Sequence, residues 1–165
     1  YNGSDSFTYV VNDGLLDSNT STVSINLSPV NDASSDFTVS ENYVLNSLEG
    51  EQETITTNYL MVTPENEQDS IKFVWNESID IDGDQILYRM IGFDGLEFLT
   101  MNDWTSDLSL SWSLSDLIAQ TDTVNVASGS WLIQATDGEF FKDSNFGEPT
   151  LFSINGSALI PEEFI

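Results

Sequence analysis

Hydrophobic and polar positions alternate in short runs along the whole chain. Residues 7–11 and 22–27 carry apolar side chains at every second position, among them Phe7, Tyr9, Val23 and Ile25, and the turn-forming run Asn12-Asp13-Gly14 separates them. A period of two is that of a strand with one apolar face, so these runs predict a two-stranded hairpin. A lone hairpin is at best marginally stable in water. We therefore expect its apolar face to pack on a neighbouring copy of the chain or to add to the sheet of a second domain.

A second series of alternating runs begins at Phe37 and predicts further strands. The side chains expected to share one side of each strand are Ile55, Tyr59 and Met61; Ile71, Phe73 and Trp75; Ile86, Tyr88 and Met90; Leu108, Leu110, Trp112 and Leu114; Trp131, Ile133 and Ala135; and finally residues 151–154. A short helical turn capped by Ser115 is expected after the fourth run. About seven short strands in about 120 residues are typical of an immunoglobulin-like sandwich.

The fold class predicted from these runs is all-β, an immunoglobulin-like β-sandwich preceded by a β-hairpin. The run Pro29-Val30-Asn31-Asp32-Ala33 interrupts the alternation and reads as a linker. The expected domains are residues 1–33 as hairpin and linker, residues 34–158 as the sandwich, and residues 159–165 as a C-terminal tail or linker.

The charge balance narrows the classes of partner. The chain has 28 Asp and Glu residues against three Lys and Arg residues, a formal net charge of −25, and residues 1 to 70 contain no basic residue. A nucleic acid or an anionic lipid surface would be repelled by such a chain, and no apolar run is long enough to span a bilayer. Self-repulsion of this size favours binding of a cation, and Ca²⁺ prefers carboxylate and carbonyl oxygen. The alternative is a salt-adapted protein with a merely solvated acidic surface.

The chain has no Cys and no His. This composition excludes disulfides, thiol nucleophiles, Ser-His-Asp catalysis and ordinary zinc sites. Carboxylate pairs occur in number, as in any chain this acidic, but nothing marks one pair as the acid and base of a hydrolase. We therefore expect the protein not to be an enzyme.

Residues 3–33 closely resemble bacterial cadherin-like tandem repeats. The resemblance rests on the run Gly3-Ser4-Asp5-Ser6-Phe7-Thr8-Tyr9-Val10-Val11-Asn12-Asp13-Gly14, on Thr22-Val23-Ser24-Ile25, and on Val30-Asn31-Asp32-Ala33, with Ser34 where that family usually has Pro. It implies that residues 1–33 are the last two strands and the linker of one repeat. The following domain more loosely resembles bacterial fibronectin type III or cadherin-like modules, through residues 73–78, 80–84, 87–89 and 129–138. In that class the residues at the positions of Trp75 and Tyr88 are buried.

Three acidic residues stand out as candidate calcium ligands. Asp80, Asp82 and Asp84 lie at i, i+2 and i+4 around Gly83, a spacing that points alternate carboxylates to one side of an extended chain. The loop is not an EF-hand, because glycine occupies its fourth position and position 91 is Ile. The simpler interpretation is an ordinary Asp-Gly turn. Three neighbouring carboxylates repel one another unless a cation lies among them, which favours calcium.

The cadherin-like resemblance implies further ligands for the same ion. The matching positions are Asp137 in the run Ala135-Thr136-Asp137-Gly138 and the linker pair Asn31 and Asp32. Asp5 and Glu41 match two further acidic positions of such repeats. The resemblance thus implies calcium at the junction between the two domains, where it would make that junction rigid.

The four tryptophans raise a second hypothesis, carbohydrate binding. Trp75, Trp112 and Trp131 lie at apolar positions of alternating strands and are expected in the core. Trp104 lies in a long insertion around residues 92–107, flanked by Asn and Asp, and could stack on a sugar ring. A Trp that folds back onto its own domain is the simpler alternative.

Two functions are therefore expected. The first is a non-catalytic, calcium-binding structural or adhesive module of a large bacterial cell-surface or secreted protein, in contact with neighbouring repeats and with surface or matrix glycans or proteins. The alternative is a carbohydrate-binding accessory module of a secreted polysaccharide-degrading enzyme. Both place the chain outside the cell.

Overall fold

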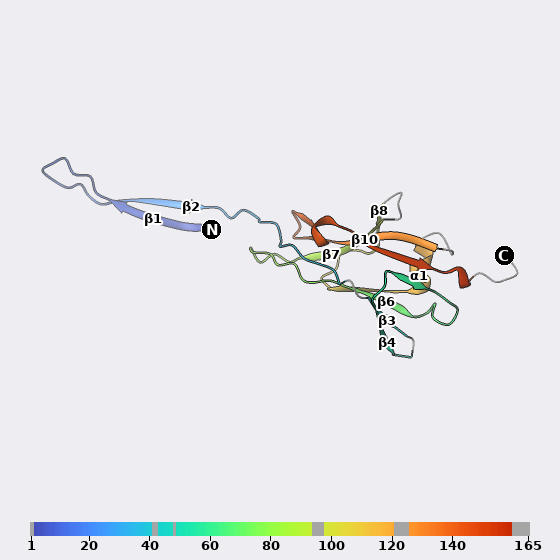
Figure 1. The fold of residues 1–165 in the computed structure, drawn as a ribbon. Coiled ribbons are helices and arrows are strands. Elements are labelled where there is room, and N and C mark those ends of the chain that lie inside the picture. Colours follow the sequence, from blue (N-terminus) through green and yellow to red (C-terminus); the bar gives the residue numbers. More distant parts are fainter. Residues whose placement is uncertain (1, 41–42, 48, 94–97, 121–125, 160–165) are drawn as a thin grey trace. The chain divides into compact units, whose positions relative to one another are not determined.

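The computed structural model describes residues 2–40, 43–47, 49–93, 98–120 and 126–159. The chain divides into two compact units, Tyr1–Asp32 and Ala33–Ile165. Each unit is a β structure with its own strand pairing (Figure 1).

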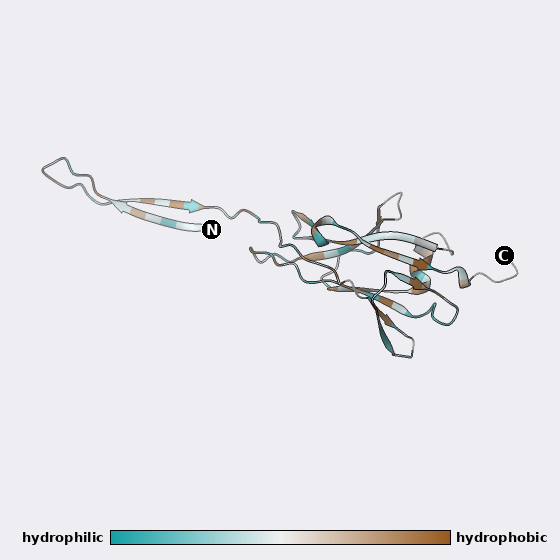
Figure 2. Ribbon diagram, viewed as in Figure 1, coloured by the Kyte–Doolittle hydropathy of each residue, from teal (hydrophilic) through white to brown (hydrophobic). Residues whose placement is uncertain are grey.

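The N-terminal unit is the predicted hairpin. Strands β1 (Gly3–Tyr9) and β2 (Ser21–Leu27) pair antiparallel, with Phe7 opposite Val23, and form a two-stranded sheet of their own. One side of the hairpin carries only hydroxyl and amide side chains, whereas the other is largely apolar, and this alternation is visible along both strands in Figure 2. Phe7 is 54% exposed and Ile25 42% exposed.

The turn of this hairpin is held by side chains of its own. Asp13 Oδ1 accepts the backbone N–H groups of Leu15 and Leu16, both at 2.9 Å, and Asn12 Nδ2 donates to Asp17 Oδ1. The bonds from Leu16 and Leu15 hold the pKa of the Asp13 carboxyl below its usual value. The Asn-Asp-Gly run thus forms the turn that its composition predicts.

The described residues of the C-terminal unit form ten strands, one short α-helix and two 3₁₀ turns. They are β3 (Tyr43–Asn46), β4 (Gln52–Ile55), β5 (Tyr59–Met61), β6 (Ser70–Val74), β7 (Leu87–Phe93), β8 (Phe98–Thr100), β9 (Ser109–Ser113), α1 (Leu114–Gln120), β10 (Val126–Thr136), β11 (Phe141–Asp143), η1 (Ser144–Gly147), β12 (Thr150–Asn155) and η2 (Ser157–Leu159).

These strands form two sheets, and the predicted all-β, immunoglobulin-like sandwich is confirmed. One sheet has the order β4-β3-β6-β9 and the other β5-β12-β10-β7-β8, with β11 also paired to β10. Strands β3, β6 and β9 take the places of strands A, B and E of an immunoglobulin-like domain, and β7, β10 and β12 those of C, F and G. Strand β5 pairs parallel to β12.

The core lies between the two sheets and is rich in aromatic rings. Phe73 from one sheet packs edge-on, and Tyr43 packs tilted, against Trp131 and Phe152 from the other, with ring centroids between 4.9 and 6.2 Å apart. Each of these side chains is at most 9% exposed. The inward alternation predicted for Ile71, Phe73 and Trp75 and for Trp131, Ile133 and Ala135 is confirmed, because all six are buried.

Two local predictions are wrong. Ile55, Tyr59 and Met61 do not share one strand, because β4 ends at Ile55 and pairs with β3 in one sheet, whereas Tyr59 begins β5, which pairs with β12 in the other. The helix starts at Leu114, which was expected in the preceding strand, and thus two residues earlier than a cap at Ser115 implies. Its first turn is capped instead by Ser113, whose Oγ accepts the N–H of Asp116 at 3.1 Å.

The chain that pairs with β10 after the turn at Gly138 is divided into two strands, β11 and β12. Between β11 and β12 the chain forms η1, in which Asn145 and Phe146 have φ of 52° and 59°. This left-handed stretch lets Asn145 N–H donate to Phe37 O at 3.0 Å, while Val39 N–H donates to Asn145 Oδ1 at 3.2 Å. The segment 37–39 is thereby attached to both sheets, because Val39 also bridges Trp75.

The chain enters and leaves this sandwich at opposite ends. Ser35 N–H donates to Ile79 O, in the loop between β6 and β7, and Leu87 at the start of β7 is level with Thr136. The last strand runs the other way, so its final residue Asn155 is level with Val126, at the far end of β10 (Figure 1).

Candidate functional site

The loop of residues 76–86 carries the three predicted calcium ligands and is anchored at both sides. Ser35 N–H donates to Ile79 O, and Ile79 N–H donates to Ser35 Oγ, both at 2.8 Å. Ser78 N–H donates to the hydroxyl of Tyr88 at 2.9 Å. Tyr88 is only 2% exposed, and burial raises the pKa of its hydroxyl. The loop therefore starts from a fixed base in the core.

Asp80 organises the loop with one of its carboxylate oxygens. Oδ1 accepts the N–H of Asp82 at 2.8 Å and the N–H of Asp84 at 3.3 Å, and Gly83 supplies the positive φ of 84° that this turn requires. The other oxygen, Oδ2, is buried and has no hydrogen-bond partner. A buried carboxylate oxygen without a partner is costly, because a charged group has lost its water without compensation.

The other acids of the loop are exposed. Asp82 and Asp84 both lie at the surface of the loop tip. Across the described ranges, no group of three or more Asp or Glu side chains is gathered closely enough to hold a metal ion. The structure thus leaves one carboxylate oxygen of Asp80 buried without a hydrogen-bond partner, and it does not gather Asp82 and Asp84 with Asp80 into a metal-holding group.

Asp137 lies in the turn between β10 and β11, at the same end of the sandwich. Its Oδ1 accepts the N–H groups of Glu139 at 2.8 Å and Phe140 at 2.7 Å, and Gly138 has a φ of 102°. The pairing of Thr136 with Leu87 puts this turn and the start of β7 at one sheet end. An ordinary Asp-Gly turn therefore explains both hydrogen bonds that Asp137 Oδ1 accepts.

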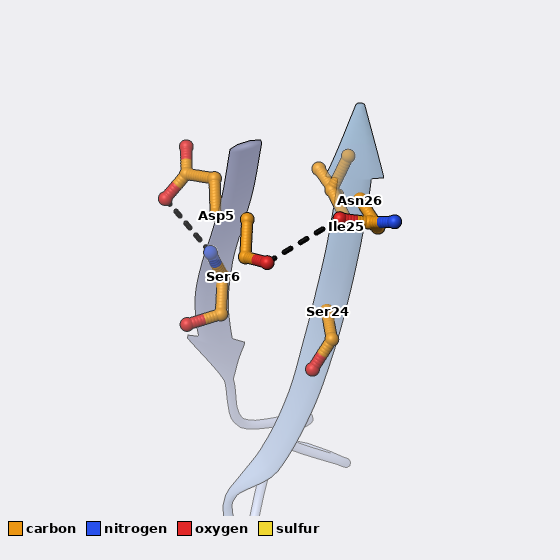
Figure 3. A pocket seen from close by; sticks show the side chains of 6 residues that line it. Asp5, Ser6, Ser24, Ile25 and Asn26 are labelled. Atoms are coloured by element: carbon orange, nitrogen blue, oxygen red, sulfur yellow. Dashed lines mark hydrogen bonds between the residues drawn. The ribbon is translucent and has the colours of Figure 1, made fainter. Parts of the chain in front are cut away.

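The remaining predicted ligands belong elsewhere in the chain. Asp5 lies on β1, where its Oδ1 accepts the N–H of Ser6 at 2.7 Å, beside a shallow hollow lined by hairpin residues (Figure 3). Asn31 and Asp32 follow β2 in the N-terminal unit, and Glu41 lies outside the described residues. That these residues share an ion with Asp80 stays a prediction.

Trp104, the candidate sugar platform, folds back onto its own domain. The guanidinium carbon of Arg89 lies 4.4 Å from the Trp104 ring centroid, and the ring stacks on Phe141 with centroids 6.0 Å apart and planes 25° apart. These contacts occupy ring surface that a sugar would need. The expected burial of Trp75 and Trp131 is confirmed, and Trp112 packs partly buried against the core.

The polar network beside Trp104 was not predicted from the sequence. Arg89 donates from Nε and Nη2 to Gln134 Oε1, at 3.1 and 2.7 Å, and Gln134 Nε2 donates to Asp143 Oδ1 at 3.0 Å. The signal for it was present: Arg89 is one of three basic residues and stands between the inward-facing Tyr88 and Met90. It therefore had to lie on the outer side of its strand.

No protein-family model and no curated protein sequence matches the chain. None of the helices in the described part of the chain combines the length and apolar character needed to cross a bilayer.

Proposed function

We propose that this protein is a non-catalytic structural module of an extracellular repeat protein, and that calcium bound at the Asp80 loop stiffens the end where the chain enters the sandwich. Its partners on this proposal are neighbouring repeats of the same polypeptide. The absence of Cys and His from the sequence supports a non-catalytic role.

The proposal rests on one observation: the two carboxylate oxygens of Asp80 have different environments. Oδ1 holds the loop through two backbone N–H groups, whereas Oδ2 is buried without a partner. Calcium prefers carboxylate oxygen and would supply the missing partner. Asp82 and Asp84 are the side chains that could complete its shell by turning towards it, and water would fill the remaining positions.

The electrostatics of the chain support the same ion. A formal charge of −25 with three basic residues leaves nearly all carboxylates without a protein cation. Lys142 Nζ forms an ion pair with Asp36 Oδ1 at 2.9 Å, and Asp36 lies on the segment that leads into the sandwich. A divalent ion near Asp80 lowers the repulsion among the carboxylates of this loop.

The route of the chain through the sandwich supports a role as one link in a series. Ser35 enters beside Ile79, and β12 ends at the opposite end of β10. A module with this route extends a row of domains lengthwise. Stiffening by calcium at the end beside Ile79 would then limit bending at that end.

The test is thermal unfolding of the whole chain with calcium and with excess chelator. Ten millimolar calcium acting on a site with a Kd of about 0.1 mM adds about 2.7 kcal/mol of stability. For a unit of this size, we expect the Tm to rise by on the order of 5–10 °C. Asp80→Asn keeps an oxygen for the loop hydrogen bonds but removes the charge, and it should abolish the shift.

Asp116→Asn is the matched control. Asp116 is an exposed acid in the first turn of α1, remote from the loop in sequence, and its loss removes the same charge. This variant should keep the full calcium shift. Equal melting of the unaltered protein in calcium and in chelator would sink the proposal.

A further inference from the structure

The outer side of the β5-β12-β10-β7-β8 sheet is unusually apolar. Strand register and alternation place nine apolar or aromatic side chains at outward positions of its strands and of β11. These are Tyr59, Met61, Leu87, Ile91, Phe93, Phe98, Leu132, Phe141 and Leu151. We call this surface the apolar outer face.

Its most prominent side chains are largely exposed. Phe98 is 74% exposed, Leu151 64% and Phe141 62%. Phe93 and Phe98 are paired across neighbouring strands, with ring centroids 4.8 Å apart. In register, Phe98, Phe93, Ser130 and Leu151 form one row across four strands. Exposed apolar side chains gathered on one side of a sheet mark an interaction site.

The apolar outer face is also electrically neutral in a strongly acidic chain. Among the outward residues on the described strands of this sheet, the charged ones are Arg89 and Asp143. Gln134 joins them, accepting from Arg89 and donating to Asp143. Their opposite charges are therefore already satisfied within the face, which lowers the cost of removing them from water.

We propose that two copies of this chain associate through their apolar outer faces. Two molecules that each carry a net charge of −25 repel one another over acidic surface, and a neutral apolar area is where close approach costs least. Burial of Phe98 and Leu151 against a partner supplies the hydrophobic gain. This inference does not depend on calcium or on the proposed function.

A neutral polysaccharide fits the face less well. Sugar recognition needs polar side chains free to bind hydroxyl groups, whereas Arg89, Gln134 and Asp143 bind one another. The Trp104 ring is covered by Arg89 and stacked on Phe141. The groups that remain most exposed are phenyl and leucine side chains, which suit an apolar protein surface.

The size of the face predicts a weak association. Five strands about 4.8 Å apart, with a mean length of about 20 Å, give about 400–500 Å² per copy, or about 1,000 Å² in total. That area lies at the lower limit for a specific interface, so we expect a reversible dimer with a Kd on the order of 10–100 μM. Added salt should tighten it, because salt screens the repulsion between the two acidic molecules.

The experiment is sedimentation equilibrium of the whole chain in chelator, at low and high salt. The unaltered protein should show a concentration-dependent dimer that strengthens with salt. Leu151→Asp and Phe98→Asp each place a charge on the apolar outer face and should weaken association at least about tenfold. Ser111→Asp places the same charge on the outer side of the other sheet and should change it less than about twofold.

Circular dichroism melting shows that each variant is folded, so that a lost dimer is not a lost fold. Three outcomes would overturn the proposal. The protein could stay monomeric at every concentration, Ser111→Asp could weaken the dimer as much as Leu151→Asp, or Phe7→Asp on the hairpin could abolish a dimer that Leu151→Asp leaves intact. Dissolution of the dimer by a soluble neutral polysaccharide would reassign the face to sugar binding.

Discussion

The two outer surfaces of the sandwich differ sharply although both sheets enclose one core. The β4-β3-β6-β9 sheet turns mainly hydroxyl, amide and lysine side chains outward: Val44, Asn46, Gln52, Thr54, Ser70, Lys72, Val74, Ser109, Ser111 and Ser113. The other sheet turns nine apolar or aromatic side chains outward, beside hydroxyl and amide side chains such as Ser130 and Gln134. An antiparallel sheet with one side in water normally alternates apolar and polar residues. The outer side of the first sheet is therefore suited to contact with water, whereas the second sheet has the composition of a sheet that is covered on both sides.

The largest expected effect separates the inner from the outer side of a single strand. Ile133 is fully buried and Leu132, its neighbour on β10, points outward. Ile133→Ala should cost about 2–4 kcal/mol in the free energy of unfolding, and Leu132→Ala less than about 1 kcal/mol. Urea unfolding measures both at a protein concentration where the chain is monomeric. Equal losses would mean that Leu132 is covered within one molecule.

A smaller effect is expected from the basic residue on each outer side. Arg89→Met removes the two bonds to Gln134 and the contact over Trp104, and should destabilise the fold by about 1–2 kcal/mol. Lys72→Met, on the polar outer side, should change stability by less than about 0.5 kcal/mol. A larger loss for Lys72→Met than for Arg89→Met would contradict the comparison.

Two tyrosines on opposite sides of the β5-β12-β10-β7-β8 sheet give the next contrast. Tyr88→Phe leaves the buried Ser78 N–H without its acceptor and should cost about 1 kcal/mol at neutral pH, whereas Tyr59→Phe, at an exposed position, should cost less than about 0.5 kcal/mol. These losses come from the same unfolding measurement.

The smallest effect is the alkaline pH dependence of the Tyr88 contribution. Burial raises the pKa of folded Tyr88 above 10.0, the unfolded value, so the unfolded chain ionises first as pH rises. The stability linked to this group is present below pH 10.0 and is lost as pH rises through the folded pKa. The gap between the unaltered protein and Tyr88→Phe should therefore narrow above pH 10.0. A constant gap would show that Tyr88 titrates alike in both states.

The sequence predicted the inward side of the sandwich better than its connections. Burial of Phe73, Trp131 and Ile133 follows from alternation, which is local. The switch between sheets after Ile55 is not local, because β5 finds its parallel partner about ninety residues later in β12. The sequence also indicates the apolar outer face, because residues 87–93 and 131–133 are apolar at nearly every position and so cannot bury all of their side chains on one side of a strand.

The sequence predicted the location of the candidate site but not the contacts of its side chains. Aspartates at alternate positions marked the loop that begins at Asp80, but their spacing could not show that Oδ1 binds the backbone of Asp82 and Asp84. Trp104 was correctly identified as a loop residue, and its folded-back position depends on Arg89 and Phe141, which lie on strands far from it in sequence.

The parallel pairing of β5 with β12 has a mechanical consequence. Ser153 N–H donates to Asn58 O at 2.7 Å, and Val62 N–H donates to Asn155 O at 2.8 Å. If the chain is pulled from both sides of this unit, tension that passes β3 and β4 draws β5 towards its own start and β12 towards its own end. The two strands then slide past each other, so the bonds between them share the load and must break together. Two strands loaded in this way resist separation more than two strands that peel apart one bond at a time.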